Sequence, residues 1–195
     1  MIYFLGHIAK FGIYGRKAVL DLENHMKTTA NVTDKSVLVL GSLNPWIEIL
    51  ALSLGAKKVV SVGYSHLKNE CHKIEYIYAP NFFKMEHFIS SFDVVITTTL
   101  FQEIGLGLSG ENLNPWMDLI SMQRIWCLTK PGGKFIFSTI LHNKDQVTYN
   151  FYRLYGPKRY KKLISNWKVL FSNVELNPVF EKKSDGYQPL TILEK

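Results

Sequence analysis

The stretch SVLVLGSLNPW at residues 36–46 decides the fold class. Residues 36–40 form a short apolar run that ends at Gly41, a pattern typical of a buried parallel strand. Asn44 is a preferred helix-capping residue, and Pro45 fits the first turn of a helix. The segment therefore predicts a strand, a turn and a helix in direct succession, with the helix spanning residues 44–54.

The same alternation of strand and helix continues along the chain. Further buried strands are predicted at 58–62, 75–78, 92–97 and 134–139. A helix at 115–128 has Met117, Ile120, Ile125 and Leu128 as its apolar positions, and the sequence KPGG at 130–133 is expected to end it.

The two ends of the chain add to this core. Ala18, Leu22 and Met26 lie at helical spacing within 14–28 and predict an amphipathic helix that covers the domain. After the fifth strand we expect a basic helix at 157–166, followed by strands at 168–175 and 189–193 that close the sheet as an antiparallel hairpin. The prediction is an α/β fold with a doubly wound, mostly parallel seven-stranded sheet in a single domain, 1–195, with a cover region at 1–30 and a core at 36–195.

Composition excludes several classes of protein. The chain has 195 residues, of which 47% are hydrophobic and 20% charged, so neither disorder nor a collagen-like fibre is expected. No apolar run reaches the roughly 20 residues of a membrane-spanning helix. Cys71 and Cys127 are too few for a disulfide scaffold, and we expect both to be reduced packing residues in a cytoplasmic protein. The six histidines form no metal-binding pattern with Cys, Asp or Glu, so no metal site is predicted.

The net charge of +7 is concentrated near the C-terminus, where residues 153–183 carry eight Lys or Arg against two Glu. Such a region could attract nucleic acid, acidic metabolites or anionic lipid, but a solvated basic face is commoner. Tyr155, Tyr160 and Trp167 lie within this region and Tyr152 lies directly before it. These aromatic residues could stack on bases, although core packing explains them better.

Five strand–helix units, a final helix and two last strands, with Pro-Gly-Gly before the fifth strand, resemble the class I S-adenosylmethionine-dependent methyltransferase fold. In that fold the turn after the first strand passes under the methionine part of S-adenosylmethionine, an acid at the end of the second strand binds the ribose, and residues after the fourth strand face the methyl donor. The resemblance implies a cofactor site at these positions: Gly41, Ser42, Leu43, Asn44, Gly63, Tyr64, Thr97 and Thr98.

This sequence departs from the fold's pattern in two places. The first turn has one glycine instead of several, and Gly63 stands where the ribose-binding acid is expected. An acid there would accept two charge-assisted hydrogen bonds from the ribose diol, so its loss should weaken cofactor binding. Glu48, Tyr64 or Ser65 could replace it, although Glu48 is expected to face solvent on the first helix.

A narrower resemblance is carried by four spaced segments, and it spans about residues 36–170. The segments are Gly105-Leu-Gly107, Asn114-Pro-Trp-Met-Asp118, Cys127 to Gly133, and Asn150-Phe-Tyr-Arg-Leu-Tyr-Gly156. They are similar to those of the family called domain of unknown function 268, whose fold is methyltransferase-like and whose reaction is not established by membership. The family pattern has an acid near position 63 and Glu-His near 103 and 104, where this chain has Gly63 and Glu103-Ile104.

Glu103 is the candidate catalytic residue. It follows the fourth strand and should enter the crevice at the carboxyl ends of the strands, where open α/β sheets bind ligands. A carboxylate there could act as a base if the methyl acceptor must lose a proton, whereas a capping or salt-bridged glutamate is the alternative. His142 is a second, weaker candidate base. The glycines at 105, 107 and 110 could let the loop move over the site, or could only form turns.

Four residues after the fifth strand are candidates for the acceptor pocket: Asp145, Asn150, Arg153 and Tyr155. Arg153 could bind a carboxylate or phosphate of the substrate through its bidentate guanidinium. A structural arginine that fixes the neighbouring loop is the alternative.

Two functions remain open on this sequence. The first is an S-adenosylmethionine-dependent methyltransferase whose acceptor is an unknown small molecule or macromolecule. The second is a catalytically inactive binding or scaffold domain with a degenerate cofactor site, which Gly63 and the sparse first turn favour. A nicotinamide-dependent oxidoreductase is disfavoured, because Gly41 is not followed by the other glycines of G-x-G-x-x-G.

Overall fold

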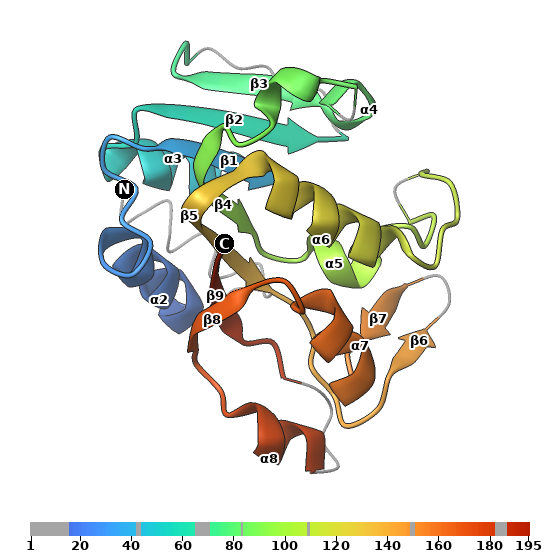
Figure 1. The fold of residues 1–195 in the computed structure, drawn as a ribbon. Coiled ribbons are helices and arrows are strands. Elements are labelled where there is room, and N and C mark those ends of the chain that lie inside the picture. Colours follow the sequence, from blue (N-terminus) through green and yellow to red (C-terminus); the bar gives the residue numbers. More distant parts are fainter. Residues whose placement is uncertain are drawn as a thin grey trace.

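A computed structural model describes residues 16–41, 44–64, 71–82, 84–108, 110–148, 151–181 and 187–195. At its centre is a seven-stranded sheet with the order β3-β2-β1-β4-β5-β9-β8 (Figure 1). The strands are β1 (Ser36–Leu40), β2 (Lys58–Gly63), β3 (Ile74–Tyr78), β4 (Phe92–Thr97), β5 (Thr129–Ser138), β8 (Lys168–Ser172) and β9 (Leu190–Glu194). β1 to β5 pair in parallel, and β9 is antiparallel to both β5 and β8. The predicted doubly wound sheet with a closing antiparallel hairpin is confirmed.

Helices cover both faces of the sheet. One face carries α2 (Arg16–Lys27) and α3 (Trp46–Ser53). The other carries α4 (Ala79–Phe82), the short 3₁₀ helix η1 (Glu86–Phe88), α5 (Leu100–Glu103), α6 (Met117–Leu128), α7 (Pro157–Leu163) and α8 (Leu176–Glu181). In the described part of the connection between β3 and β4, residues 79–82 and 84–91, the sheet is covered by a four-residue helix and one 3₁₀ turn.

The strands are apolar throughout because both faces of the sheet are buried. In β1, Val37 and Val39 pack in the cluster under α2 and α3, whereas Leu38 packs in the cluster under α6. Successive side chains of a strand point to opposite faces, so a strand between two helical layers needs apolar residues at every position. This explains why SVLVL reads as a continuous run.

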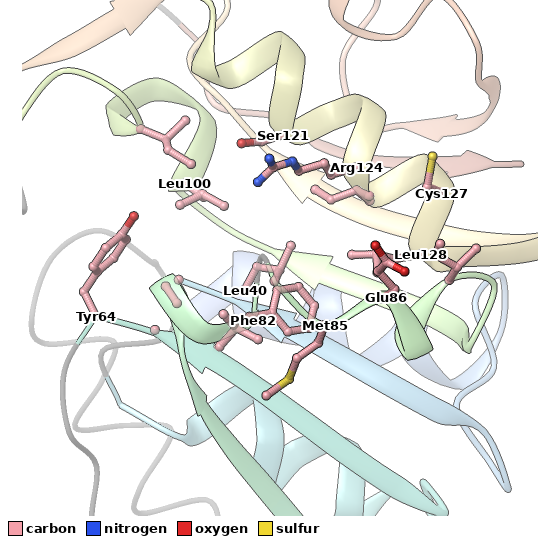
Figure 2. A pocket seen from close by; sticks show the side chains of 17 residues that line it. Leu40, Tyr64, Phe82, Met85, Glu86, Leu100, Ser121, Arg124, Cys127 and Leu128 are labelled. Carbon is pink, nitrogen blue, oxygen red and sulfur yellow. The ribbon is translucent and has the colours of Figure 1, made fainter. Parts of the chain in front are cut away.

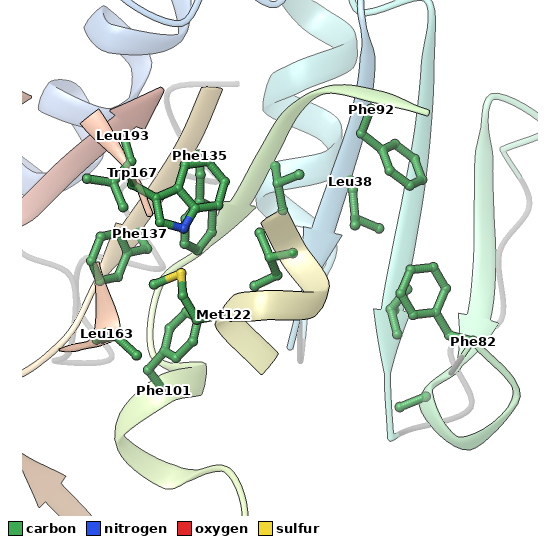
Figure 3. Close-up of a cluster of buried hydrophobic side chains, with 14 of the residues drawn as sticks. Leu38, Phe82, Phe92, Phe101, Met122, Phe135, Phe137, Leu163, Trp167 and Leu193 are labelled. Atoms are coloured by element: carbon green, nitrogen blue, oxygen red, sulfur yellow. The ribbon is translucent and has the colours of Figure 1, made fainter. Parts of the chain in front are cut away.

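Aromatic rings dominate the core on the α6 side (Figure 3). The rings of Phe135 and Phe137 on β5 stack with centroids 5.1 Å apart, and Phe101 of α5 meets both edge-on at 5.9 and 5.7 Å. Trp167 packs on Phe135 at 5.5 Å. Offset and edge-to-face pairs add to the stabilisation from buried area, so these rings fix α5 against β5. Tyr155, Tyr160 and Trp167 of the basic region are buried, which confirms core packing for these three aromatic side chains.

Both Asn-Pro-Trp segments lie just before a helix, but neither asparagine is its cap. Pro45 is the N-cap of α3, and Trp116 is the N-cap of α6. The amide of Trp116 donates to Oδ1 of Asn114 at 3.0 Å. Asn114 therefore makes a local side-chain turn that precedes α6, and the predicted helix start is one residue early for α3 and two residues early for α6.

The KPGG segment is part of β5 and not a loop. Gly132 has a φ of 72°, and the pairing of β4 with β5 shifts register between Phe92 and Val94, so the strand starts with a bulge. A Cβ on Gly133 would lie 2.7 Å from Cγ2 of Thr129, so only glycine fits there. The glycines thus allow a strand to begin directly after the helix.

The buried faces of α2 and α6 are shifted by about one residue from the faces that the sequence predicted. In α2, Leu22 and Met26 are buried as predicted, but Val19 is buried in place of Ala18. In α6 the buried residues are Asp118, Ser121, Met122 and Ile125, and Ile120 is exposed. Two polar residues on the core-facing side of α6 were therefore missed.

Three further findings complete the fold. A second, two-stranded antiparallel sheet of β6 (Gln146–Thr148) and β7 (Tyr152–Leu154) was not predicted. Cys71 and Cys127 are exposed and form no disulfide with each other, so the prediction that they are packing residues is wrong. Among the described residues, no helix has both the length and the apolar character needed to cross a membrane.

Candidate functional site

A cavity of about 210 Å³ lies between α6 and the sheet (Figure 2). Its walls come from the ends of β1 and β2 and from α4, η1, α5 and α6. Figure 2 shows Tyr64 at one end, and Glu86, Cys127 and Leu128 at the other. The cavity thus opens at the carboxyl edge of β1 and β2 and continues beneath α6.

The lining of the cavity is mostly apolar. Leu40 and Val62 form the floor on the sheet, and Phe82, Leu100 and Ile125 stand around them. The side chains with polar atoms are few: Tyr64, Glu86, Ser121, Arg124 and Cys127. An apolar hollow with a small number of placed polar groups is the usual form of a small-molecule site.

Gly41 and Gly63 both line the cavity, which brings together two of the positions predicted for cofactor binding. Gly41 has a φ of 75°, and its amide donates to the carbonyl of Val62 at 2.8 Å. A side chain at Gly41 would be strained in this left-handed conformation, and its Cβ would lie 3.4 Å from Leu100. Gly41, directly after β1, therefore lies close against the end of β2.

At the end of β2 the structure has an aromatic residue and no acid. Gly63 pairs with Tyr78 on β3, and the next residue, Tyr64, meets the ring of Tyr78 edge-on at 6.3 Å. Burial, followed by the nearby carboxylate of Glu111, raises the pKa of the Tyr64 phenol. Tyr64 is thus a neutral hydrogen-bonding group at the mouth of the cavity.

Glu48 is buried, so the expectation that it faces solvent is wrong. Its exposed fraction is 0%, and the hydroxyl of Ser61 on β2 donates to its Oε1 at 2.5 Å. Glu48 lies on α3, on the opposite face of the sheet from the cavity. A polar strand residue, Ser61, within an otherwise apolar run is the sequence signal for this buried partner.

Glu103 is the last residue of α5, and it does not line the cavity, although Leu100 and Ile104 beside it do. Burial raises the pKa of Glu103, Glu111 adds to this effect, and a hydrogen bond with Gln102 opposes it. The amides of Gly105 and Gly107 donate to Oε1 of Glu111 at 3.1 and 3.0 Å. The glycine loop after α5 is thus held by its own carboxylate, and the role of Glu103 as a base stays a prediction.

Arg153 and Tyr155 are built into the protein interior. Arg153 is 1% exposed, and its guanidinium donates to the carbonyl of Ile104 at 2.5 Å. The hydroxyl of Tyr155 donates to the carbonyl of Phe101 at 2.7 Å and to Oδ2 of Asp118 at 2.9 Å. Burial, followed by the Asp118 carboxylate, raises the pKa of Tyr155 well above its usual range. The alternative of a structural arginine thus has direct geometric support, whereas the proposed substrate contacts have none in this structure.

Asp118 is the centre of this buried network. Its exposed fraction is 0%, and Arg159 donates to both of its oxygens, from Nε at 2.8 Å and from a terminal nitrogen at 2.7 Å. The ion pair with Arg153 is longer, at 4.0 Å. The network therefore ties the start of α6 to β7 and α7.

The other predicted site residues are spread along the same edge of the sheet. Asp145 is exposed and accepts from the amide of Arg159 at 3.0 Å, so its carboxylate caps α7 from outside the helix. Thr97 is 1% exposed at the end of β4, and the carbonyl of Thr98 accepts from Gln188 at 3.5 Å. Asn44 is exposed just before α3. Ser42, Leu43, Ser65 and Asn150 lie outside the described residues.

Metal binding has no support in the described part of the chain, where no group of three or more His, Cys, Asp or Glu side chains could hold an ion. His142, the second candidate base, is half-buried, and its Nδ1 lies 3.2 Å from the amide of Lys144, a local turn contact. Neither observation adds a reactive group to the cavity.

Residues 34–184 match the model of a family described as a Caenorhabditis protein of unknown function, DUF268. The comparison with curated proteins found no match.

Several solved structures share the fold at low sequence identity. A structure from Listeria monocytogenes, provisionally assigned as an S-adenosylmethionine-dependent methyltransferase, is 16% identical with a TM-score of 0.61, over 90% of this chain and 99% of that one. The Burkholderia thailandensis 1,6-didemethyltoxoflavin-N1-methyltransferase, solved with its namesake compound and S-adenosylhomocysteine, is 13% identical with a TM-score of 0.60, over 92% and 81%. The [4+2]-cyclase SpnF is 10% identical with a TM-score of 0.60, over 94% and 84%. These similarities establish a Rossmann-like methyltransferase fold.

Proposed function

This chain belongs to the DUF268 family, and we propose that it is an S-adenosylmethionine-dependent methyltransferase. Its acceptor is a small molecule or macromolecule that the site does not identify. The observation that carries the proposal is the position of the cavity, which opens where β1 and β2 end. Open α/β sheets bind ligands at the carboxyl ends of their strands, and the relatives in fold include methyltransferases.

The residues of the cavity fit the adenine ring of this cofactor better than they fit its ribose. The apolar cavity suits a flat ring, and Tyr64 stands at its mouth. The turn at Gly41, continuing through Ser42 and Leu43 to Asn44, is proposed for the methionine part, with Thr97 and Thr98 facing the sulfur. Because Gly63 carries no carboxylate, the ribose diol lacks the acceptor usual for the fold, and affinity should be reduced. When bound, the cofactor supplies an electrophilic methyl group.

Glu103 is proposed as the base for acceptors that must lose a proton. Burial raises the pKa of its carboxyl, and a carboxylate with a raised pKa is a stronger base at neutral pH. The variant Glu103→Gln should lose turnover while keeping its affinity for S-adenosylhomocysteine, since Glu103 does not line the cavity. Turnover equal to wild type with any identified acceptor would remove Glu103 from this role.

Calorimetric titration of the purified protein tests the function. We expect S-adenosylmethionine and S-adenosylhomocysteine to bind with micromolar affinity, about −8 kcal/mol, and NAD to give no heat. No heat and no competition at millimolar adenosyl ligand, with a folded sample, would contradict the proposal.

A second candidate is a binding or scaffold domain that kept the fold and lost the cofactor. Gly63 favours it, and SpnF supports it by showing that the fold is not confined to methyl transfer. Absence of adenosyl binding, together with retained binding of another ligand or protein, would select this candidate.

A further inference from the structure

The cavity beneath α6 has the size of a two-ring group. An apolar cavity of about 150 Å³ is enough to bind benzene, and this one measures about 210 Å³. In Figure 2, α6 lies on one side of it, and the sheet with Phe82 and Met85 lies on the other. Two apolar walls that face each other across a cavity of this volume suit a flat fused ring.

One buried polar atom in the wall has no partner. Seven buried side-chain atoms in the described part of the chain lack a hydrogen bond, and of these only the hydroxyl of Ser121 belongs to a residue that lines the cavity. Ser121 is 5% exposed. Leaving a buried hydroxyl unpaired costs stability, and such groups in native proteins are rare enough to need an explanation.

The position of Ser121 fits a role toward a ligand. It lies on α6 one turn before Ile125, and both residues line the cavity. Two charged residues, Glu86 and Arg124, also line the cavity; both are exposed, and Figure 2 shows the side chain of Arg124 on the α6 side, next to Ser121. The apolar floor and walls favour an uncharged ring as the buried part of a ligand, and that ring must bring one hydrogen-bonding edge to Ser121.

We propose that the cavity binds an uncharged fused-ring heterocycle and that Ser121 on α6 selects it by a hydrogen bond to the ring edge. The inference rests on the proposed function in the simplest case, in which the ring is the adenine of an adenosyl ligand. A free heteroaromatic ligand offers the same chemistry. Ser121 is a specificity residue here and takes no part in the transfer of a methyl group.

Two serine variants separate a ligand role from a structural one. Ser121→Ala removes a hydroxyl without a partner, whereas Ser61→Ala removes a hydroxyl that donates to buried Glu48. Without ligand, the melting temperature of Ser121→Ala should equal or exceed that of wild type, and that of Ser61→Ala should fall. With ligand, Ser121→Ala should bind adenosine and S-adenosylhomocysteine about 5- to 10-fold more weakly, the effect of one hydrogen bond, and Ser61→Ala should stay within about twofold.

Calorimetry with S-adenosylhomocysteine, adenosine and indole distinguishes the outcomes. If the adenosyl probes bind wild type and Ser121→Ala equally well, the role of Ser121 is overturned while the proposed function stands. S-adenosylhomocysteine could fail to bind while adenosine or indole binds with an affinity that depends on Ser121. In that case the inference stands with a free heterocycle, and the methyltransferase proposal fails. If none of the three binds the folded wild-type protein at millimolar concentration, both proposals are overturned.

Discussion

The two halves of the sheet's carboxyl edge differ in the surroundings of their polar side chains. Beside β4 and β5, Asp118, Arg153, Tyr155 and Arg159 bond to one another and to backbone carbonyls. Beside β1 and β2 there is an open apolar cavity, whose buried hydroxyl at Ser121 has no partner among the described residues.

The difference shows that a polar residue type does not by itself mark a ligand site, because the contacts of the side chain decide what it can bind. Arginine, tyrosine and aspartate look like substrate ligands in a sequence, yet here most of their donors and acceptors are bonded inside the fold, and Nε of Arg153 is the one buried atom of these four side chains that has no hydrogen bond in the described structure. A serine on an apolar helix face attracts no notice in a sequence, yet it carries the unused hydroxyl. Of the unpartnered buried atoms in the described part of the chain, only that of Ser121 belongs to a residue of the cavity lining, so a ligand there could gain this hydrogen bond without breaking another.

The largest expected effect concerns Asp118. Replacing it by alanine removes the buried carboxylate that pairs with Arg159 and Arg153 and leaves Arg159 and Tyr155 only their backbone acceptors, and breaking a buried ion pair costs about 3 to 5 kcal/mol. Urea denaturation should show this loss of unfolding free energy. Asp145→Ala is the control, because the carboxylate of Asp145 is exposed and its loss as a helix cap should cost only about 0.5 to 1 kcal/mol. Equal losses in the two variants would mean that the network is not a structural unit.

A second, smaller effect is expected at Gly63. Gly63→Asp restores a carboxylate at the end of β2, where the ribose diol would donate to it, and affinity for S-adenosylhomocysteine should rise about tenfold, or about 1.4 kcal/mol. Calorimetry of Gly63→Asn provides the matched control, since asparagine has nearly the same shape without the charge. A gain no larger than that of asparagine would place the ribose elsewhere.

The smallest effect is a pH dependence of stability that arises away from both regions, at Asp93. Burial raises the pKa of Asp93, but the amide of Ser36 and the ion pair with Lys130 outweigh it, so the net pKa is lowered. A carboxyl with a lowered folded pKa stabilises the protein above its unfolded pKa and loses that stabilisation as pH falls through the folded pKa.

Thermal unfolding between pH 7 and pH 3 measures this contribution. Asp93→Asn should cost about 1 kcal/mol at pH 7 and lose less stability than wild type below about pH 4. Glu175→Gln, at an exposed position, should follow the wild-type pH profile. Parallel profiles for Asp93→Asn and wild type would contradict the assignment.

Sequence patterns predicted the sheet well because burial on both faces leaves a direct mark. Residues 36–40 had to be apolar at every position, and the structure places them between two helical layers. The hairpin of β6 and β7 lacks such a mark, since all three residues of β6 are exposed.

The candidate site was harder to predict, because polar residues gain their roles from contacts across long stretches of sequence. Arg153 meets the carbonyl of Ile104 from 49 positions away, and Glu48 is buried because Ser61 lies across from it on the next strand. Ser121 could have been found only from the helical spacing that puts it on the face of Ile125. Gly41 and Gly63 both line the cavity because the sheet sets where its strands end, and their role in cofactor binding stays a prediction.

The most direct test of the central claim is a methyl nuclear magnetic resonance titration of isoleucine- and leucine-labelled protein with S-adenosylhomocysteine. If the adenosyl ring enters the cavity, the largest shifts should be those of Leu40, Leu100, Ile104 and Ile125, which line it. Ile140 and Leu154, which do not line it, should change little. Shifts confined to Ile140 and Leu154, or no shifts at saturating ligand, would contradict the account.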